Sequence, residues 1–251
     1  AVALLVRLAL AEQTYGAVGL LTSGGLTNDQ LRTLFAIVAL AMAVGIVASA
    51  LTLSERRLPW QIVVAALTIA LGAWMDAGAS NLTRPPQLYL SQALLGFGTT
   101  LFIGPALVYG LLQMFKRGSD HLVTIVVLFS ITQNVGGLLG SAILGTYQTI
   151  EARAHAGALS EHLLASDPAV FDRLRLGAGI IAKVVTDPVQ RSAQGAGLLA
   201  RAMTQEATIL AYNDVFRFVA ILATISAAYI GGLILVSAIR RRRLVTLGSS
   251  S

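Results

Sequence analysis

The chain has 251 residues, of which 55% are hydrophobic and only 12% are charged, with a net charge of +6. Soluble domains contain about 25% charged residues, so the composition argues against an ordinary soluble fold. The absence of cysteine excludes disulfides and thiolate metal sites. The basic residues stand at the ends of apolar runs, and this distribution does not indicate nucleic acid as a partner.

Six apolar runs follow one another along the chain. Each is long enough to cross a bilayer, which takes roughly 20 residues, and helices satisfy their own backbone hydrogen bonds in lipid. We therefore predict an all-α polytopic membrane bundle of six transmembrane helices. We also expect the first helix to begin upstream of residue 1, in a longer protein, because Ala1 already lies inside a run. The runs cover 1–22, 31–53, 59–80, 88–115, 121–150 and 215–239.

The first run contains two charged side chains. Glu12 stands about ten residues before the end of the run, or roughly 15 Å at 1.5 Å per residue. That depth is near the middle of a hydrocarbon core about 30 Å thick, where an ionisable group is a functional candidate. We expect Glu12 to take up and release protons, with Arg7 as its counter-charge and Gln13 beside a substrate cavity. A static buried ion pair is the alternative.

The third and fourth runs contain further polar positions. Asp76 is expected near the external end of the third helix. In the fourth, Pro105 is expected to kink or loosen the helix, since proline lacks a backbone donor. Such a helix can line a transport site or merely fit the bundle. Gln92, Tyr109 and Gln113 are candidates for lining a substrate cavity.

The fifth run combines amides with glycine. Gln133 and Asn134 are candidates for the substrate cavity, although hydrogen bonds between helices are the alternative. Gly136 and Gly140 form a GxxxG pair, which predicts close packing against neighbouring helices.

The segment that follows is more polar. Asp167-Pro168 and Asp187-Pro188 each resemble the start of a helix, so we predict two short external helices within 151–210. Their charged side chains form either a solvated face or a surface for a protein partner. We predict that Asp214 caps the last helix. The domain organisation expected is 1–150 for five transmembrane helices, 151–210 for the external segment, 211–243 for the last helix and its basic end, and 244–251 for a flexible tail.

Loop charges predict the orientation. Short loops rich in Lys and Arg stay in the cytoplasm. The loops 54–58 and 116–120 and the arginines at 240–243 are therefore expected to be cytoplasmic, and the loops 23–30 and 81–87 external.

Catalytic and metal-binding patterns are missing from the sequence. His121, His155 and His162 have no spacing that predicts a metal site, and no GxSxG, HExxH or P-loop pattern occurs. We therefore expect neither an enzyme nor a bound cofactor or metal.

Three stretches carry a resemblance to a known family. Residues 88–115 with the loop after them, residues 134–153 and residues 202–217 resemble the C-terminal half of 14-helix drug:proton antiporters of the major facilitator superfamily, the EmrB/QacA-type branch. The resemblance covers the chain as the last six helices. At Gln92, the matching motif of the family's N-terminal half has arginine.

The resemblance implies a multi-pass protein of the bacterial inner membrane. It would export small amphipathic drugs or toxic metabolites in exchange for protons, by alternating access between two six-helix halves. Its partners would be the N-terminal transporter half and a periplasmic adaptor protein. The alternative is a non-transporting membrane subunit that docks a periplasmic partner through 151–210.

Overall fold

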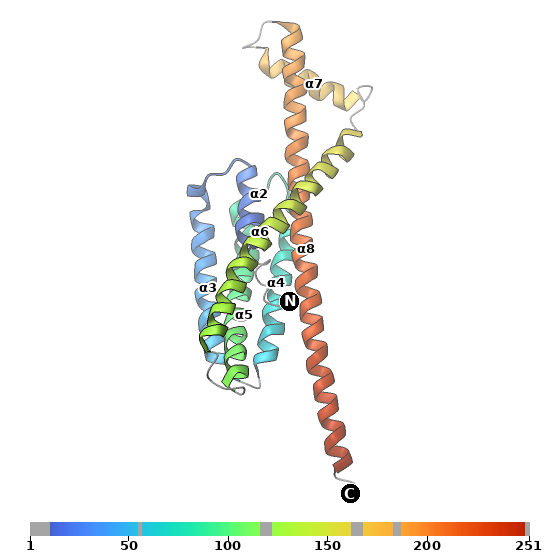
Figure 1. Cartoon of the computed structure of the whole chain (residues 1–251). Helices are drawn as coiled ribbons and strands as arrows, with labels where there is room; N and C mark the ends of the chain where they lie inside the picture. The colour runs from blue at the N-terminus through green and yellow to red at the C-terminus, as the bar shows by residue number, and fades with distance from the viewer. Residues whose placement is uncertain (1–10, 55–56, 116–121, 162–167, 183–186, 249–251) are drawn as a thin grey trace.

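The computed structural model describes residues 11–54, 57–115, 122–161, 168–182 and 187–248, and this part of the chain contains helices and turns but no strand (Figure 1). The elements are the π-helix η1 (Glu12–Ala17), α2 (Val18–Ser23), the 3-10 helix η2 (Asn28–Leu31), α3 (Arg32–Thr52), α4 (Leu58–Asp76), the 3-10 helix η3 (Pro85–Leu88), α5 (Tyr89–Phe115), α6 (Leu122–Glu161), α7 (Pro168–Ile181) and α8 (Pro188–Gly248).

Membrane association follows from the length and apolarity of these helices. Among the described residues, three stretches are long and apolar enough to cross a bilayer: Asn28–Thr52, Leu58–Asp76 and the apolar part of Pro188–Ser237. Large apolar side chains on these helices, such as Leu40, Leu51 and Trp74, are exposed, as expected for surfaces that face lipid. The all-helical class is thus confirmed, and the count of six spans stays a prediction.

Close packing holds α5 between α3 and α4. A Cβ on Gly45 of α3 would stand 2.7 Å from the Phe97 carbonyl oxygen of α5. A Cβ on Gly98 of α5 would stand 3.0 Å from the Ala65 carbonyl oxygen of α4. Small residues let backbones approach where lipid is as apolar as the side chains, so these glycines explain why the three helices form one layer.

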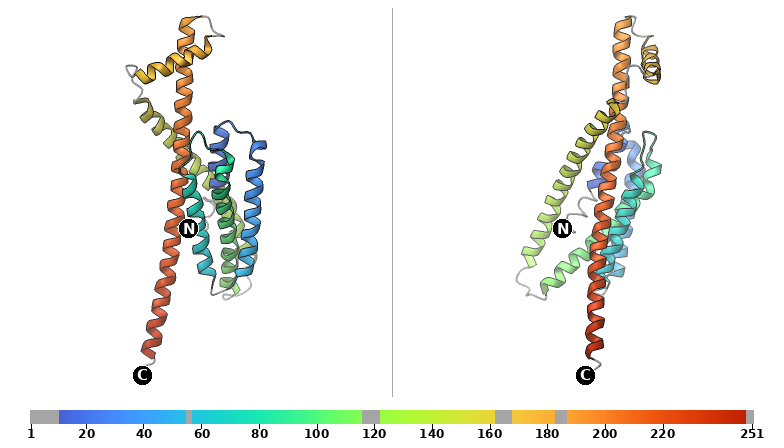
Figure 2. Two further views of the ribbon diagram at one scale, coloured as in Figure 1. Left: turned by 180° about the vertical axis from the view of Figure 1, so that it is seen from behind. Right: turned by 90° about the vertical axis from the view of Figure 1, so that its right-hand side faces the viewer.

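The core lies where α8 crosses this layer. Val215 and Phe216 of α8 are fully buried, and they pack near Ile69 of α4 and the helical turns of η1 and α2. Leu144 of α6 is buried in the same core. Figure 2 shows that α8 runs along the whole molecule, while one half of α6 stands apart from α8.

Two helices are longer than the sequence predicts. Helix α6 continues past residue 150 to Glu161. The second external helix is not a separate element, because α8 extends without interruption for 61 residues and includes 188–210. The prediction that Asp214 caps the last helix is wrong for the same reason.

The residues at the start of α8, and the lack of proline after them, explain the length of this helix. The Asp187 carboxylate accepts a hydrogen bond from the Val189 backbone nitrogen at 2.9 Å, which caps the start of α8. No proline follows Pro188 in the chain, so nothing comparable ends the helix before the membrane segment. The expected domain limits at 150/151 and 210/211 therefore fall inside helices, and 244–248 are helical.

Three predicted packing residues can be placed. Helix α5 continues through Pro105, which is buried. Gly136 and Gly140 are buried on α6. Their roles in kinking and packing stay predictions.

Candidate functional site

Two carboxyl groups and one amide meet inside the helical bundle. Glu12, Asp76 and Gln92 come from η1, α4 and α5, and their exposed fractions are 0%, 1% and 1%. The Gln92 side-chain nitrogen donates to Asp76 Oδ2 at 2.6 Å and lies 3.4 Å from Glu12 Oε1. One amide group thus joins two acidic side chains from different helices.

The π-helix η1 positions Glu12. A π-helix makes i→i+5 hydrogen bonds and often occurs at functional sites, and Glu12 is the first residue of this one. Next to it, a Cβ on Gly16 would stand 2.7 Å from the Phe216 ring of α8. The segment η1 thus packs closely against α8, while the Glu12 carboxyl group contacts Gln92 of α5, which also bonds Asp76 of α4.

Asp76 and Gln92 lie near the ends of their helices. Asp76 is the last residue of α4, and Gln92 lies in the first turn of α5. Glu12 is separated from the end of its own helical segment by the rest of η1 and by α2, roughly 16 Å at 1.5 Å per residue. Glu12 lies level with the ends of α4 and α5 that the loop 77–84 joins, and its depth in the bilayer stays a prediction.

The electrostatics of this cluster are unbalanced. Within the described residues, Glu12 Oε2 and Asp76 Oδ1 are buried and have no hydrogen-bond partner. In the same part of the chain, neither carboxyl forms an ion pair with Lys, Arg or His. Burying polar atoms without partners costs free energy, so this arrangement calls for a proton or another cation at the pair.

The other predicted site residues are placed only in part. Arg7 lies outside the described residues, as do the side chains of Gln13, Tyr109, Gln113 and Gln133. Asn134 is exposed on α6. Of the residues predicted from sequence, the structure brings together Glu12 and Gln92, and it adds Asp76, which was not among the site candidates.

A groove lies beside η1 and opens along α6. Its volume is about 470 Å³, and its lining includes Tyr15 and the α6 residues Ser141, Thr149 and Arg153. Tyr15 contacts α6 closely, since its hydroxyl would stand 3.0 Å from a Cβ on Gly145. Hydroxyl groups, an aromatic ring and a cation thus line a groove one helical turn from Glu12.

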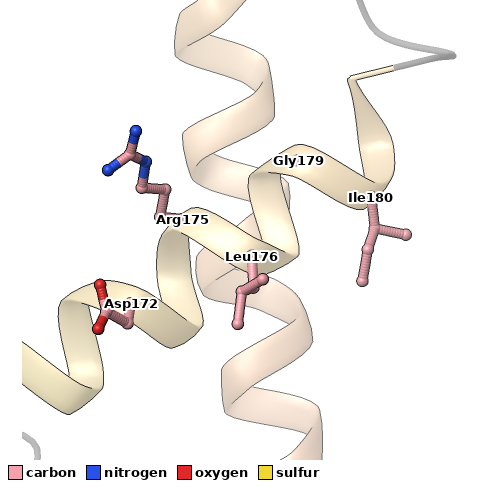
Figure 3. A pocket seen from close by; sticks show the side chains of 5 residues that line it. All are labelled: Asp172, Arg175, Leu176, Gly179 and Ile180. Carbon is pink, nitrogen blue, oxygen red and sulfur yellow. The ribbon is translucent and has the colours of Figure 1, made fainter.

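A second hollow lies on α7. Its volume is about 610 Å³, and Figure 3 shows its five lining residues, all from α7: Asp172, Arg175, Leu176, Gly179 and Ile180. Leu176 and Ile180 point to the same side of the helix (Figure 3). A hollow lined by one helix is an open surface rather than an enclosed site.

No known protein-family model matches this chain, and no curated protein matches it either. Evidence for its function therefore comes from its residues and their packing.

Proposed function

We propose that this chain is the C-terminal six-helix half of a proton-driven exporter of small amphipathic compounds, which works by alternating access in the bacterial inner membrane. The observation that carries the proposal is the buried cluster of Glu12, Gln92 and Asp76. A membrane bundle retains such groups at a cost in stability, and ionisable groups of this kind mark proton and ion pathways.

The cluster has the chemistry of a proton site. Two carboxylates held to one amide repel each other strongly in an apolar interior, where charges are poorly screened. One added proton removes a negative charge and supplies a donor for one of the oxygens that lack a partner. Contact with water on one side of the membrane releases that proton, since water solvates both carboxylates.

The same cluster links a proton to helix movement. Gln92 joins η1 to the α4–α5 layer, so a change of charge at the pair alters how the first helical segment packs on that layer. Tyr15 lies in η1 three residues after Glu12 and lines the groove along α6. Movement of η1 would therefore alter the groove that we assign to the substrate.

Transport by the full-length protein in lipid vesicles tests this proposal. The probe is ethidium, an amphipathic cation, with a pH-sensitive dye inside the vesicles. We expect an imposed pH gradient to drive ethidium accumulation in the wild type. Glu12→Gln and Asp76→Asn should reduce accumulation more than tenfold, whereas ethidium exchange without a gradient continues.

Asp29→Asn is the matched control, because Asp29 is an exposed carboxylate in η2. It should accumulate ethidium as the wild type does. Full accumulation by Glu12→Gln and Asp76→Asn would reject proton coupling at this pair.

A second candidate function is a membrane subunit that docks a periplasmic partner through 151–210. It is favoured by exposed apolar side chains on the external extension, since Leu176, Ile180 and Val189 are 67%, 73% and 75% exposed. Leu176→Asp and Ile180→Asp should then abolish the complex that co-purifies with the wild type, with ethidium exchange unchanged. A complex that survives both changes excludes this surface.

A further inference from the structure

Glu151, His155 and Asp214 meet where α6 packs against α8. One ligand atom from each lies within 4.8 Å of the other two. His155 Nε2 lies 2.6 Å from Asp214 Oδ2, and the Arg217 guanidinium donates to the other Asp214 oxygen, Oδ1, at 3.0 Å. The His155 and Asp214 side chains are 31% and 19% exposed, so an ion from solvent can reach them.

Helical geometry brings these three residues together. Glu151 and His155 are four residues apart on α6, and that spacing places them on the same face. Asp214 comes from α8, which packs against α6 at this level. Arg217 lies three residues after Asp214 and holds its carboxylate in place. One imidazole and two carboxylates therefore converge from two helices whose positions are set by the core.

We propose that Glu151, His155 and Asp214 bind a divalent transition-metal ion, with Zn²⁺ as the ion that best fits this set. Imidazole nitrogen and carboxylate oxygen are Zn²⁺ ligands at about 2.0–2.2 Å, and imidazole favours Zn²⁺ and its neighbours over Mg²⁺ or Ca²⁺. The ion replaces the direct His155–Asp214 hydrogen bond. Because ligand atoms already lie within 4.8 Å, rotations of these partly exposed side chains suffice to bring them to bonding distance.

The surroundings of the site support this assignment. Arg217 bonds to Asp214 Oδ1, whereas Oδ2 faces His155, so the cation orients the carboxylate without occupying the oxygen that the metal needs. Outer hydrogen bonds of this kind commonly orient metal ligands. Three protein ligands leave a fourth position for water. A bound ion would join α6 to α8 and strengthen their contact.

Zinc binding by the full-length protein tests the proposal. The protein is purified without a polyhistidine tag, stripped of metal and titrated with Zn²⁺ in competition with a chromophoric chelator. We expect one tight equivalent per chain. His155→Ala and Glu151→Gln should each weaken binding more than tenfold, and Co²⁺ should give the intense visible absorption of a four-coordinate site that His155→Ala loses.

Matched controls separate this site from other possible ligands. His121→Ala and His162→Ala remove the chain's other two histidines, and Glu161→Gln removes an exposed carboxylate at the end of α6. All three should keep wild-type affinity. Zn²⁺ binding that is unaffected by His155→Ala, or absent from the folded wild type, would overturn the proposal. Ethidium transport does not enter this test, so it stands or falls separately from the proposed function.

Discussion

Gln92 donates from its side-chain nitrogen toward two carboxyl groups at once. An amide is neutral, so it links the two acidic groups without cancelling their charge. An arginine at this position would hold both carboxyls as anions in a fixed ion pair. Glutamine does not fix the charge of either carboxyl group, which is what the proposed proton coupling requires.

Replacing Gln92 removes the donor that both carboxyls face. We expect Gln92→Leu to lower the free energy of unfolding by about 1–3 kcal/mol, the usual cost of leaving buried polar groups without partners. Unfolding in mixed micelles with increasing SDS measures it. Gln190→Leu, at an exposed position of α8, is the control and should change little. Equal stabilities of both variants would mean that Gln92 does not stabilise the pair.

Two glycines should respond to alanine with opposite signs. A Cβ on Gly72 would stand 2.8 Å from the Ser91 carbonyl oxygen, whereas a Cβ on Gly137 would have no atom within 4 Å. We expect Gly72→Ala to destabilise by about 1–3 kcal/mol through overpacking. Gly137→Ala should stabilise by up to about 1 kcal/mol, since alanine favours a helix. The same SDS titration decides it, and a shift of equal sign in both would refute the packing at Gly72.

The sequence indicates the residues of the buried cluster better than the contacts between them. Glu12 and Gln92 are conspicuous because polar groups are rare in apolar runs. Asp76 is less conspicuous, since a carboxylate near a helix end is ordinary. Its contact with Gln92 depends on how α4 and α5 pack, and that register is set by glycines 72 and 98 rather than by any local pattern.

At the scale of elements, α7 rests on α8 through a contact between two glycines. A Cβ on Gly195 would stand 3.0 Å from the Ala178 nitrogen and the Leu174 carbonyl oxygen, and a Cβ on Gly177 would stand 3.4 Å from Gly195 Cα. Any larger side chain at this crossing must push the two backbones apart.

Leucine at this crossing should therefore release α7. We expect trypsin to cut at Arg173 and Arg175 about tenfold faster in Gly195→Leu, which corresponds to about 1.4 kcal/mol of docking free energy, since cleavage follows the open population. Gly197→Leu is the matched control, because no atom lies within 4 Å of a Cβ there. Equal cleavage of the two variants would contradict the docked position.

The apolar runs located the helices more accurately than they located the helix ends. The run at 31–53 became α3 (Arg32–Thr52), and that at 88–115 became α5 (Tyr89–Phe115). Beyond the bilayer, polar residues continue a helix as readily as apolar ones, so apolarity does not mark where α6 and α8 stop or start. That is why Asp214 was expected at a helix start and lies inside α8, beside His155.

At the scale of the whole molecule, the charges of the loops predict which ends of the helices face the cytoplasm. Ser54 lies just after the C-terminal end of α3, on the side where the chain leads into α4. At the opposite end, α3 is preceded by η2, which contains the exposed Asp29. If α3 spans the bilayer, these two positions are on opposite sides of it.

The absence of native cysteine makes this orientation easy to test. We expect Asp29→Cys, Leu82→Cys and Gln190→Cys to react with a membrane-impermeant maleimide in intact cells, because these positions are exposed and predicted to be external. Ser54→Cys should react only after the cells are made permeable. Equal labelling of Ser54→Cys and Asp29→Cys in intact cells would show that α3 does not cross the membrane.

The unbroken length of α8 has a mechanical consequence. Its 61 residues extend about 90 Å, whereas the hydrocarbon core takes only about 30 Å of that length. A stiff helix that is held near its middle tilts as one unit. A tilt of about 10° displaces a point 40 Å from the pivot by about 7 Å, and the two ends swing in opposite directions. A tilt of α8 would therefore move the end that carries α7 and the end that carries the arginines at 240–243 at the same time.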